Sequence, residues 1–187
     1  MLKKILLGTA IGLSAASFAH ATEVTHLGGD ITPEQVKEAQ QAWGEALVAI
    51  ATTYENEGID AARELASTII EGAYGYAMGP VLFKPTLASD PQTFRTTAEG
   101  ALAYFVGHSD EFPEDSGFAL KGWQEVEVDN AAIFISGDTA LTMGHVAMLD
   151  SEGNTTTVDK TWGYQLDDEG NLRIVLHHSS LPYTQEG

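Results

Sequence analysis

The sequence predicts an α+β domain in which helices come first and pack on one face of a strongly bent antiparallel sheet. Two observations predict this. Up to Gly107 apolar residues recur at helical spacing, and from Gly117 onward short runs of strand-forming residues are separated by the turn sequences SEGN and DEGN. With 187 residues, 43% of them hydrophobic, the chain is large enough to bury the core of one such domain.

The first 21 residues have the pattern of a secretory signal peptide. MLKK is positively charged, ILLGTAIGLSAASF is apolar, and Ala19-His20-Ala21 has the small-residue pattern of a cleavage site. The apolar run is short for a stable membrane span, so an uncleaved anchor is the weaker alternative. We therefore expect residues 1–21 to be a signal peptide, residues 22–187 to form one domain, and the mature protein to be periplasmic or secreted.

Three helices are predicted in the first half of the mature chain. The first follows a polar leader that we expect to be mobile; it begins after the N-cap Thr32 and ends at Gly58. The second helix covers DAARELASTIIEGAYGY, residues 60–76. GPVLFKPT, residues 79–86, is too short and too rich in proline for a helix and predicts a strand or an extended arm. RTTAEGALAYFVG, residues 95–107, predicts the third helix.

Four or five antiparallel strands are predicted to follow. They are GFALKGWQEVEVDN, AAIFISG, DTALTMGHVAMLD, TTTVDKTWGYQLDD and LRIVLHHSS. With helices on one face, the other face of the sheet is left to be covered. We therefore expect a homodimer or larger homo-oligomer formed through that outer face, with Trp123, Trp162 and Tyr164 on it.

Composition excludes several classes of function. The chain has no cysteine, which rules out disulfides, thiolate metal sites and cysteine nucleophiles. Its formal net charge of −18 disfavours nucleic acid and anionic membranes as partners. The adjacent His177 and His178 of the last strand point to opposite faces, so both cannot bind one metal ion without distortion, and a zinc site is disfavoured.

The same alternation divides HHSS into two pairs. His177 and Ser179 share one face with Val175, whereas His178 and Ser180 share the other face with Ile174 and Leu176. One pair is free to line a pocket, and the other is then solvated or bound to loop backbone. The residues alone do not decide which pair is which, or whether HHSS is a site at all.

Four segments of the chain resemble the iota-class carbonic anhydrases, in the bacterial and algal branch that works without metal. The segments are GPVLFKPT, ALAYFVG, GDTALTMG and WGYQLDDEGNLRIVLHHSSLPY. The resemblance runs from about residue 42 to residue 183, and HHSSLPY is its most specific part. It implies a cone-shaped fold like that of nuclear transport factor 2, a homodimer or larger homo-oligomer, and reversible hydration of carbon dioxide to bicarbonate. By the same resemblance Thr86, Tyr104 and Ser179 are catalytic, His177 binds the substrate with them, and no metal or cofactor is needed.

A non-catalytic module is the alternative. The same cone fold serves small-ligand-binding and oligomerisation modules, so the fold by itself does not imply an enzyme. A polar pocket floor formed by Thr86, Tyr104 and Ser179 would favour the enzyme, whereas an apolar pocket would favour a hydrophobic ligand. The group that accepts the proton is left open, because a tyrosine with an ordinary pKa near 10 is a poor base at neutral pH.

Overall fold

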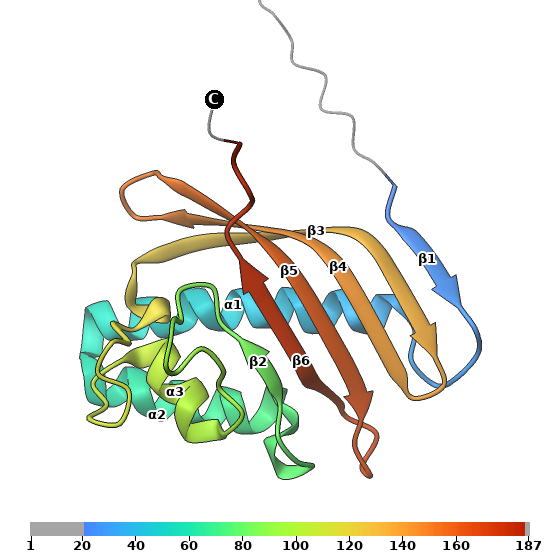
Figure 1. Ribbon diagram of the computed structural model, residues 1–187, viewed down its shortest axis with the longest axis horizontal. Coiled ribbons are helices and arrows are strands. Elements are labelled where there is room, and N and C mark those ends of the chain that lie inside the picture. The colour runs from blue at the N-terminus through green and yellow to red at the C-terminus, as the bar shows by residue number, and fades with distance from the viewer. Residues whose placement is uncertain (1–20, 186–187) are drawn as a thin grey trace, which may run out of the picture.

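The computed structural model describes residues 21–185, and all but the last residue of the predicted signal peptide lies outside them. A bent sheet of six strands, in the order β1-β3-β4-β5-β6-β2, carries the helices on one side (Figure 1). The helices are α1 (Pro33–Glu57), α2 (Ile59–Ala73) and α3 (Ala98–Val106), with two 3₁₀ turns, η1 (Gly75–Ala77) and η2 (Phe118–Leu120). The strands are β1 (Glu23–His26), β2 (Leu82–Lys84), β3 (Trp123–Ser136), β4 (Thr139–Asp150), β5 (Thr155–Leu166) and β6 (Leu172–Ser180). The predicted α+β class is confirmed.

The first helix has the boundaries that its capping residues predict. Thr32 accepts a hydrogen bond from the backbone N–H of Gln35, and the Gln35 side chain accepts one from the backbone of Thr32. This reciprocal pair satisfies two N–H groups that the first turn leaves free. Gly58 ends the helix, and α2 starts directly after it. The long α1 lies across the strands and covers the concave side of the sheet (Figure 1).

The long strands form an antiparallel meander, β3-β4-β5-β6. The two runs expected as separate strands before the first hairpin form one strand, β3, which is bent by a bulge between Asn130 and Ala132. Gly144 lies opposite the bulge, where a Cβ atom would come within 2.0 Å of the Asp129 carbonyl oxygen. Only a residue without a side chain fits this close approach, so the bend of the sheet depends on it.

Both edges of the sheet are covered by short parallel strands. β2 pairs with β6, which brings residues 82–84 beside residues 176–178. β1 pairs with β3, and the His26 ring nitrogen Nε2 lies 3.1 Å from the Ile31 carbonyl oxygen. The expectation of a mobile leader was therefore wrong for residues 23–26. Backbone pairing with an open sheet edge holds them, and polar composition does not reveal such pairing.

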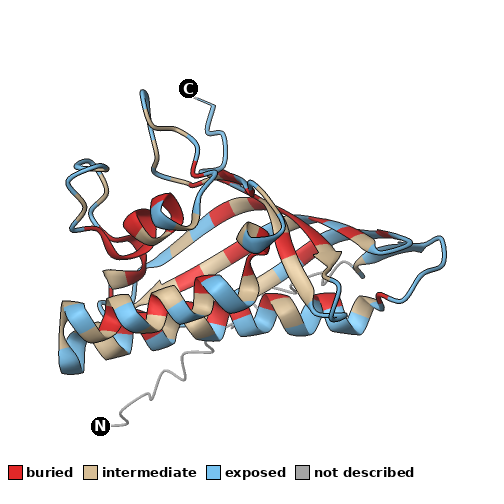
Figure 2. Ribbon diagram, turned by 90° about the horizontal axis from the view of Figure 1, so that it is seen from below, coloured by how far each residue is buried: buried red, intermediate tan, exposed pale blue. Residues whose placement is uncertain are grey.

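The core lies between the concave side of the sheet and the three helices. Figure 2 shows buried positions on the sides of the helices and strands that face one another. The prediction that Trp123, Trp162 and Tyr164 cover the outer sheet face was wrong, because all three are at most 3% exposed and belong to this inner core. Large aromatic side chains gain more from the interior of a single chain than from a surface. Among residues 21–185 no helix is long and apolar enough to cross a membrane.

Candidate active site

The last strand turns its polar end into the core. His177 and Ser179 are each 1% exposed, whereas His178 is exposed and Ser180 is half-buried. The pairing of β5 with β6 shifts by one residue between Gly163 and Tyr164, which pair with Leu176 and Ile174. Val175 is the extra residue of this bulge. Strict alternation put Ile174 on the face opposite His177; that was wrong, since the bulge brings Ile174 into the same core.

Three hydroxyl groups meet at this strand end, from β6, from α3 and from the segment after β2. The Thr86 hydroxyl donates a hydrogen bond of 2.6 Å to Oγ of Ser179. The hydroxyl of Tyr104 is buried near Thr86 and the Leu87 backbone, but it makes no hydrogen bond of normal geometry. Burial raises the pKa of Tyr104. The structure thus brings Thr86, Tyr104 and Ser179 together, with one hydroxyl still lacking a partner.

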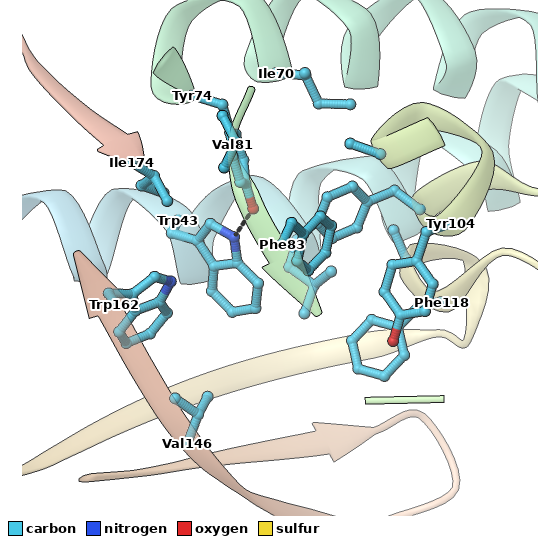
Figure 3. Close-up of a cluster of buried hydrophobic side chains, with 14 of the residues drawn as sticks. Trp43, Ile70, Tyr74, Val81, Phe83, Tyr104, Phe118, Val146, Trp162 and Ile174 are labelled. Atoms are coloured by element: carbon cyan, nitrogen blue, oxygen red, sulfur yellow. Dashed lines mark hydrogen bonds between the residues drawn. The ribbon is translucent and has the colours of Figure 1, made fainter. Parts of the chain in front are cut away.

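Aromatic rings fix the position of Tyr104. Its ring stacks on Phe118, with 5.4 Å between the ring centroids, and meets Phe83 edge-on at 5.7 Å (Figure 3). Phe83 also stacks on the His177 ring at 4.4 Å. Phe83 therefore contacts both the tyrosine and the histidine, and aromatic packing holds the Tyr104 ring in place.

His177 uses both ring nitrogens inside the protein. Nδ1 lies 2.9 Å from the Tyr74 hydroxyl, and Nε2 lies 2.8 Å from Nζ of Lys160. Trp43 extends the chain, because its indole N–H donates to the Tyr74 hydroxyl at 3.0 Å (Figure 3). Burial lowers the pKa of His177 well below its ordinary value, and the charge of Lys160 lowers it further. The imidazole is therefore neutral, and neither of its nitrogens is free for a ligand while these two bonds hold.

Lys160 is a buried amine. It is 5% exposed, and its Nζ lies 4.6 Å from the centroid of the Trp43 ring and 5.3 Å from that of Trp162. Burial lowers the pKa of Lys160 to about 7. Within residues 21–185 the structure places no carboxylate within 4.0 Å of this nitrogen. An amine without a counter-ion in such surroundings exchanges its proton near neutral pH.

The sequence alone did not single out Lys160, Tyr74 or Trp43. Lys160 belongs to an alternating stripe of large side chains on β5, a pattern that by itself indicates sheet packing. The available signal was its place between Val158 and Trp162 on an inward face, since lysine is rarely buried without a functional reason.

The polar groups elsewhere do not gather into a metal centre. Within the described part of the chain no group of three His, Cys, Asp or Glu side chains is placed to hold a metal ion. Nδ1 of His145 lies 3.2 Å from Oδ1 of Asp159 on the outer face, where the two side chains are 60% and 47% exposed.

Comparison with solved structures first defines the class of fold. A structure from Xanthomonas campestris assigned to the calcium/calmodulin dependent protein kinase II association domains superposes with a TM-score of 0.51 at 19% identity, over 87% of this chain and 96% of that one. One from Streptomyces avermitilis in the nuclear transport factor 2-like family gives 0.51 at 15% identity, over 81% and 96%. The chain thus has the nuclear transport factor 2-like fold, as predicted.

Closer relatives then define the family. The family model described as metal-independent carbonic anhydrase matches residues 34–181. A metal-independent carbonic anhydrase from Nostoc sp. is 63% identical over 155 residues, which cover 83% of this chain and 76% of that protein. The crystal structure of a cyanobacterial iota-carbonic anhydrase complexed with bicarbonate superposes with a TM-score of 0.83 at 60% identity, over 86% of this chain and 99% of that one. This chain belongs to the metal-independent carbonic anhydrase family.

The buried amine predicts a pH dependence of stability. The folded pKa of Lys160 is about 7 and the ordinary value is 10.5, so between these values the unfolded chain binds more protons than the folded chain. The free energy of unfolding of the wild type therefore rises with pH in this window, by roughly 1.4 kcal/mol per pH unit. Lys160→Met removes this increase, and urea denaturation at several pH values measures it. Parallel stability curves for the two proteins would show that Lys160 titrates normally.

Proposed function

We propose that the chain catalyses the reversible hydration of carbon dioxide to bicarbonate at the buried cluster of Thr86, Tyr104 and Ser179. The chain is a carbonic anhydrase of the metal-independent class, and the crystallised cyanobacterial relative binds bicarbonate. The observation that carries the assignment of this site is the hydroxyl of Tyr104. It is buried without a partner beside the hydrogen-bonded Thr86–Ser179 pair, as expected of a group that waits for a ligand.

The hydroxyls suit an anion with three oxygens. Because Thr86 donates to Ser179, the hydroxyl hydrogen of Ser179 remains free to donate to a substrate oxygen. Tyr104, whose hydroxyl lies near Thr86, supplies a second donor. Two fixed donors in a water-poor site stabilise the negative charge that develops on carbon dioxide as water attacks its carbon. His177, with both nitrogens bound to Tyr74 and Lys160, orients this wall of the site.

Hydration by metal-depleted protein tests the proposed reaction. The wild-type protein, chelated exhaustively and shown free of metal by elemental analysis, is expected to hydrate carbon dioxide in a stopped-flow assay. Tyr104→Phe and Ser179→Ala are each expected to lower kcat by roughly 10²-fold or more, the scale for loss of a proton-transfer or positioning group. Tyr104→Phe is expected to leave stability almost unchanged, since it removes a hydroxyl that has no partner.

Ser180→Ala is the matched control, because Ser180 is the neighbour of Ser179 on the other face of the same strand. It is expected to retain nearly full activity. Activity that disappears on chelation and returns with zinc or manganese would contradict the metal-free reaction. A silent Ser179→Ala together with an inactive Ser180→Ala would contradict the site.

We further propose that two copies of the chain associate through the outer sheet face. A row of cross-strand neighbours crosses five strands there: Phe134, Leu141, Gly163, Leu176 and Leu82. Phe134 and Leu141 are 44% and 45% exposed, and Leu82 is 62% exposed. A Cβ atom on Gly163 would meet Leu176 at 2.9 Å and Leu141 at 3.2 Å, so the leucines close over the glycine. An apolar row of this kind suits a two-fold axis, where each copy presents the same surface.

Leu141→Glu tests this interface. The charge lies within the apolar row, between Phe134 and Gly163, so the variant is expected to be monomeric in light scattering at a concentration where the wild type is a dimer. Leu27→Glu is the control, because Leu27 is 65% exposed but lies outside the row. A monomeric wild type at micromolar concentration would refute the proposal.

Export to the periplasm or the medium is proposed from residues 1–21 alone. The charged start, apolar run and Ala-His-Ala pattern support a signal peptide that is removed after Ala21. The mass of the protein recovered from the periplasmic fraction measures this. A chain that begins at Thr22 is expected, and an intact Met1 would contradict it.

A further inference from the structure

The reaction releases a proton, and the hydroxyl cluster has no good acceptor for it. Burial raises the pKa of Tyr104, which makes its phenolate scarce at neutral pH. His177 is a weak base because burial and Lys160 lower its pKa, and both of its nitrogens are engaged. Lys84 donates to the Ser179 carbonyl oxygen at 3.2 Å and acts there as a donor. A different group must accept the proton.

Lys160 lies close enough to Ser179 to accept the proton. Lys160 and Ser179 are paired residues of β5 and β6, both side chains are buried on the inner face, and such neighbours have Cβ atoms about 4.5–5.5 Å apart. One position further along, Trp162 pairs with His177, whose Nε2 contacts the amine. The amine therefore lies on the same inner wall as the hydroxyl that we assign to the substrate.

The hydrogen bonds of His177 accommodate an amine in either charge state. The indole N–H of Trp43 can only donate, so the Tyr74 oxygen accepts from it and the Tyr74 hydroxyl hydrogen is free to donate to Nδ1 of His177. The ring hydrogen of His177 is then on Nε2, which donates to the nitrogen of a neutral Lys160. Each of the three contacts in this arrangement then has one donor and one acceptor. A protonated Lys160 can only donate, so Nε2 becomes the acceptor and the ring hydrogen moves to Nδ1. The charge of the amine thus sets the tautomer of the imidazole.

Resting on the proposed function, we infer that Lys160 holds the proton released by hydration and balances the charge of the bicarbonate formed beside Ser179. The water oxygen forms a bond to carbon while one of its O–H bonds breaks. An electron pair of a C=O bond moves onto oxygen, and the proton ends on Nζ of Lys160. Carbon dioxide, water and a neutral amine thus become bicarbonate and an ammonium ion, with no other reactant.

The surroundings of Lys160 favour this exchange. The titratable groups that face it in the hydrogen-bonded network are His177, which contacts the amine, and Tyr74 behind it, and neither is a carboxyl group. Within residues 21–185 no carboxylate competes for the ammonium, so the bicarbonate is its counter-ion. When bicarbonate leaves, the uncompensated charge is again disfavoured, and the amine returns its proton.

Two substitutions separate the two roles of Lys160, which are to accept the proton and to balance the charge of bicarbonate. Lys160→Met removes the amine and is expected to lower kcat for hydration by 10²-fold or more, and to abolish the rise of kcat with pH near 7. Lys160→Arg keeps a positive charge but cannot release its proton. It is expected to bind bicarbonate within about threefold of the wild type in a calorimetric titration, yet to lose turnover as Lys160→Met does. Lys37→Met, at an exposed position of α1, is the control and is expected to match the wild type.

Direct titration of the wild type tests the inference even if a variant does not fold. In ¹⁵N-lysine NMR the Nζ resonance of Lys160 is the one missing from the spectrum of Lys160→Met; if that variant does not fold, it is the one that differs from the resonances of exposed lysines. This resonance is expected to titrate near neutral pH, and its pKa is expected to rise when bicarbonate is added. An Nζ that titrates near 10 would overturn the inference, as would a Lys160→Met protein with wild-type turnover and pH profile. A wild type that hydrates no carbon dioxide would instead overturn the proposed function.

Discussion

The hydrogen-bonded chain from Trp43 to Lys160 ties the layers of this protein together. It starts on α1, passes through Tyr74 at the end of α2 and through His177 on β6, and ends at Lys160 on β5. A buried polar group without a hydrogen-bond partner lowers the stability of the fold. This series of hydrogen bonds therefore specifies how the helices pack on the sheet. The same contacts place an amine, with no carboxylate of residues 21–185 within 4.0 Å, on the wall that also carries Ser179. The architecture and the chemistry that we propose therefore depend on one set of bonds.

The proposed site consists of ordinary hydroxyl and amine groups. None of Thr86, Ser179 and Tyr104 is reactive in water at neutral pH, and burial raises the pKa of Tyr104 further. In the proposed reaction these hydroxyls act through their fixed positions, where they donate to the negative charge that develops on the substrate. The buried Lys160 complements them in that proposal, because the desolvation that weakens an acid such as tyrosine turns an amine into a usable base.

The two faces of the sheet differ in character. Bulges at Ala131 in β3 and at Val175 in β6 bend the sheet around α1, and His177 and Ser179 point inward. The apolar row that includes Leu141 occupies the outer face, where the exposed His178 and the half-buried Ser180 also lie. Adjacent residues of HHSS therefore belong to different surfaces: one faces the core that holds the proposed site, and the other is the face through which we propose that two copies associate.

The sequence by itself determined what local rules can express. The capping residues placed α1 and α3, the turn residues placed the hairpins, and the motif carried the fold and the cluster of Thr86, Tyr104 and Ser179. Only the tertiary structure decided the edge strand β1, the inward burial of Trp123, Trp162 and Tyr164, the bulge at Val175, and the partners of His177. These depend on contacts between residues more than 100 positions apart, such as Tyr74 and His177, which are 103 positions apart. Periodicity within one strand carries no information about such contacts, so the alternation of β5 does not show that Trp43 of α1 and His177 of β6 enclose Lys160.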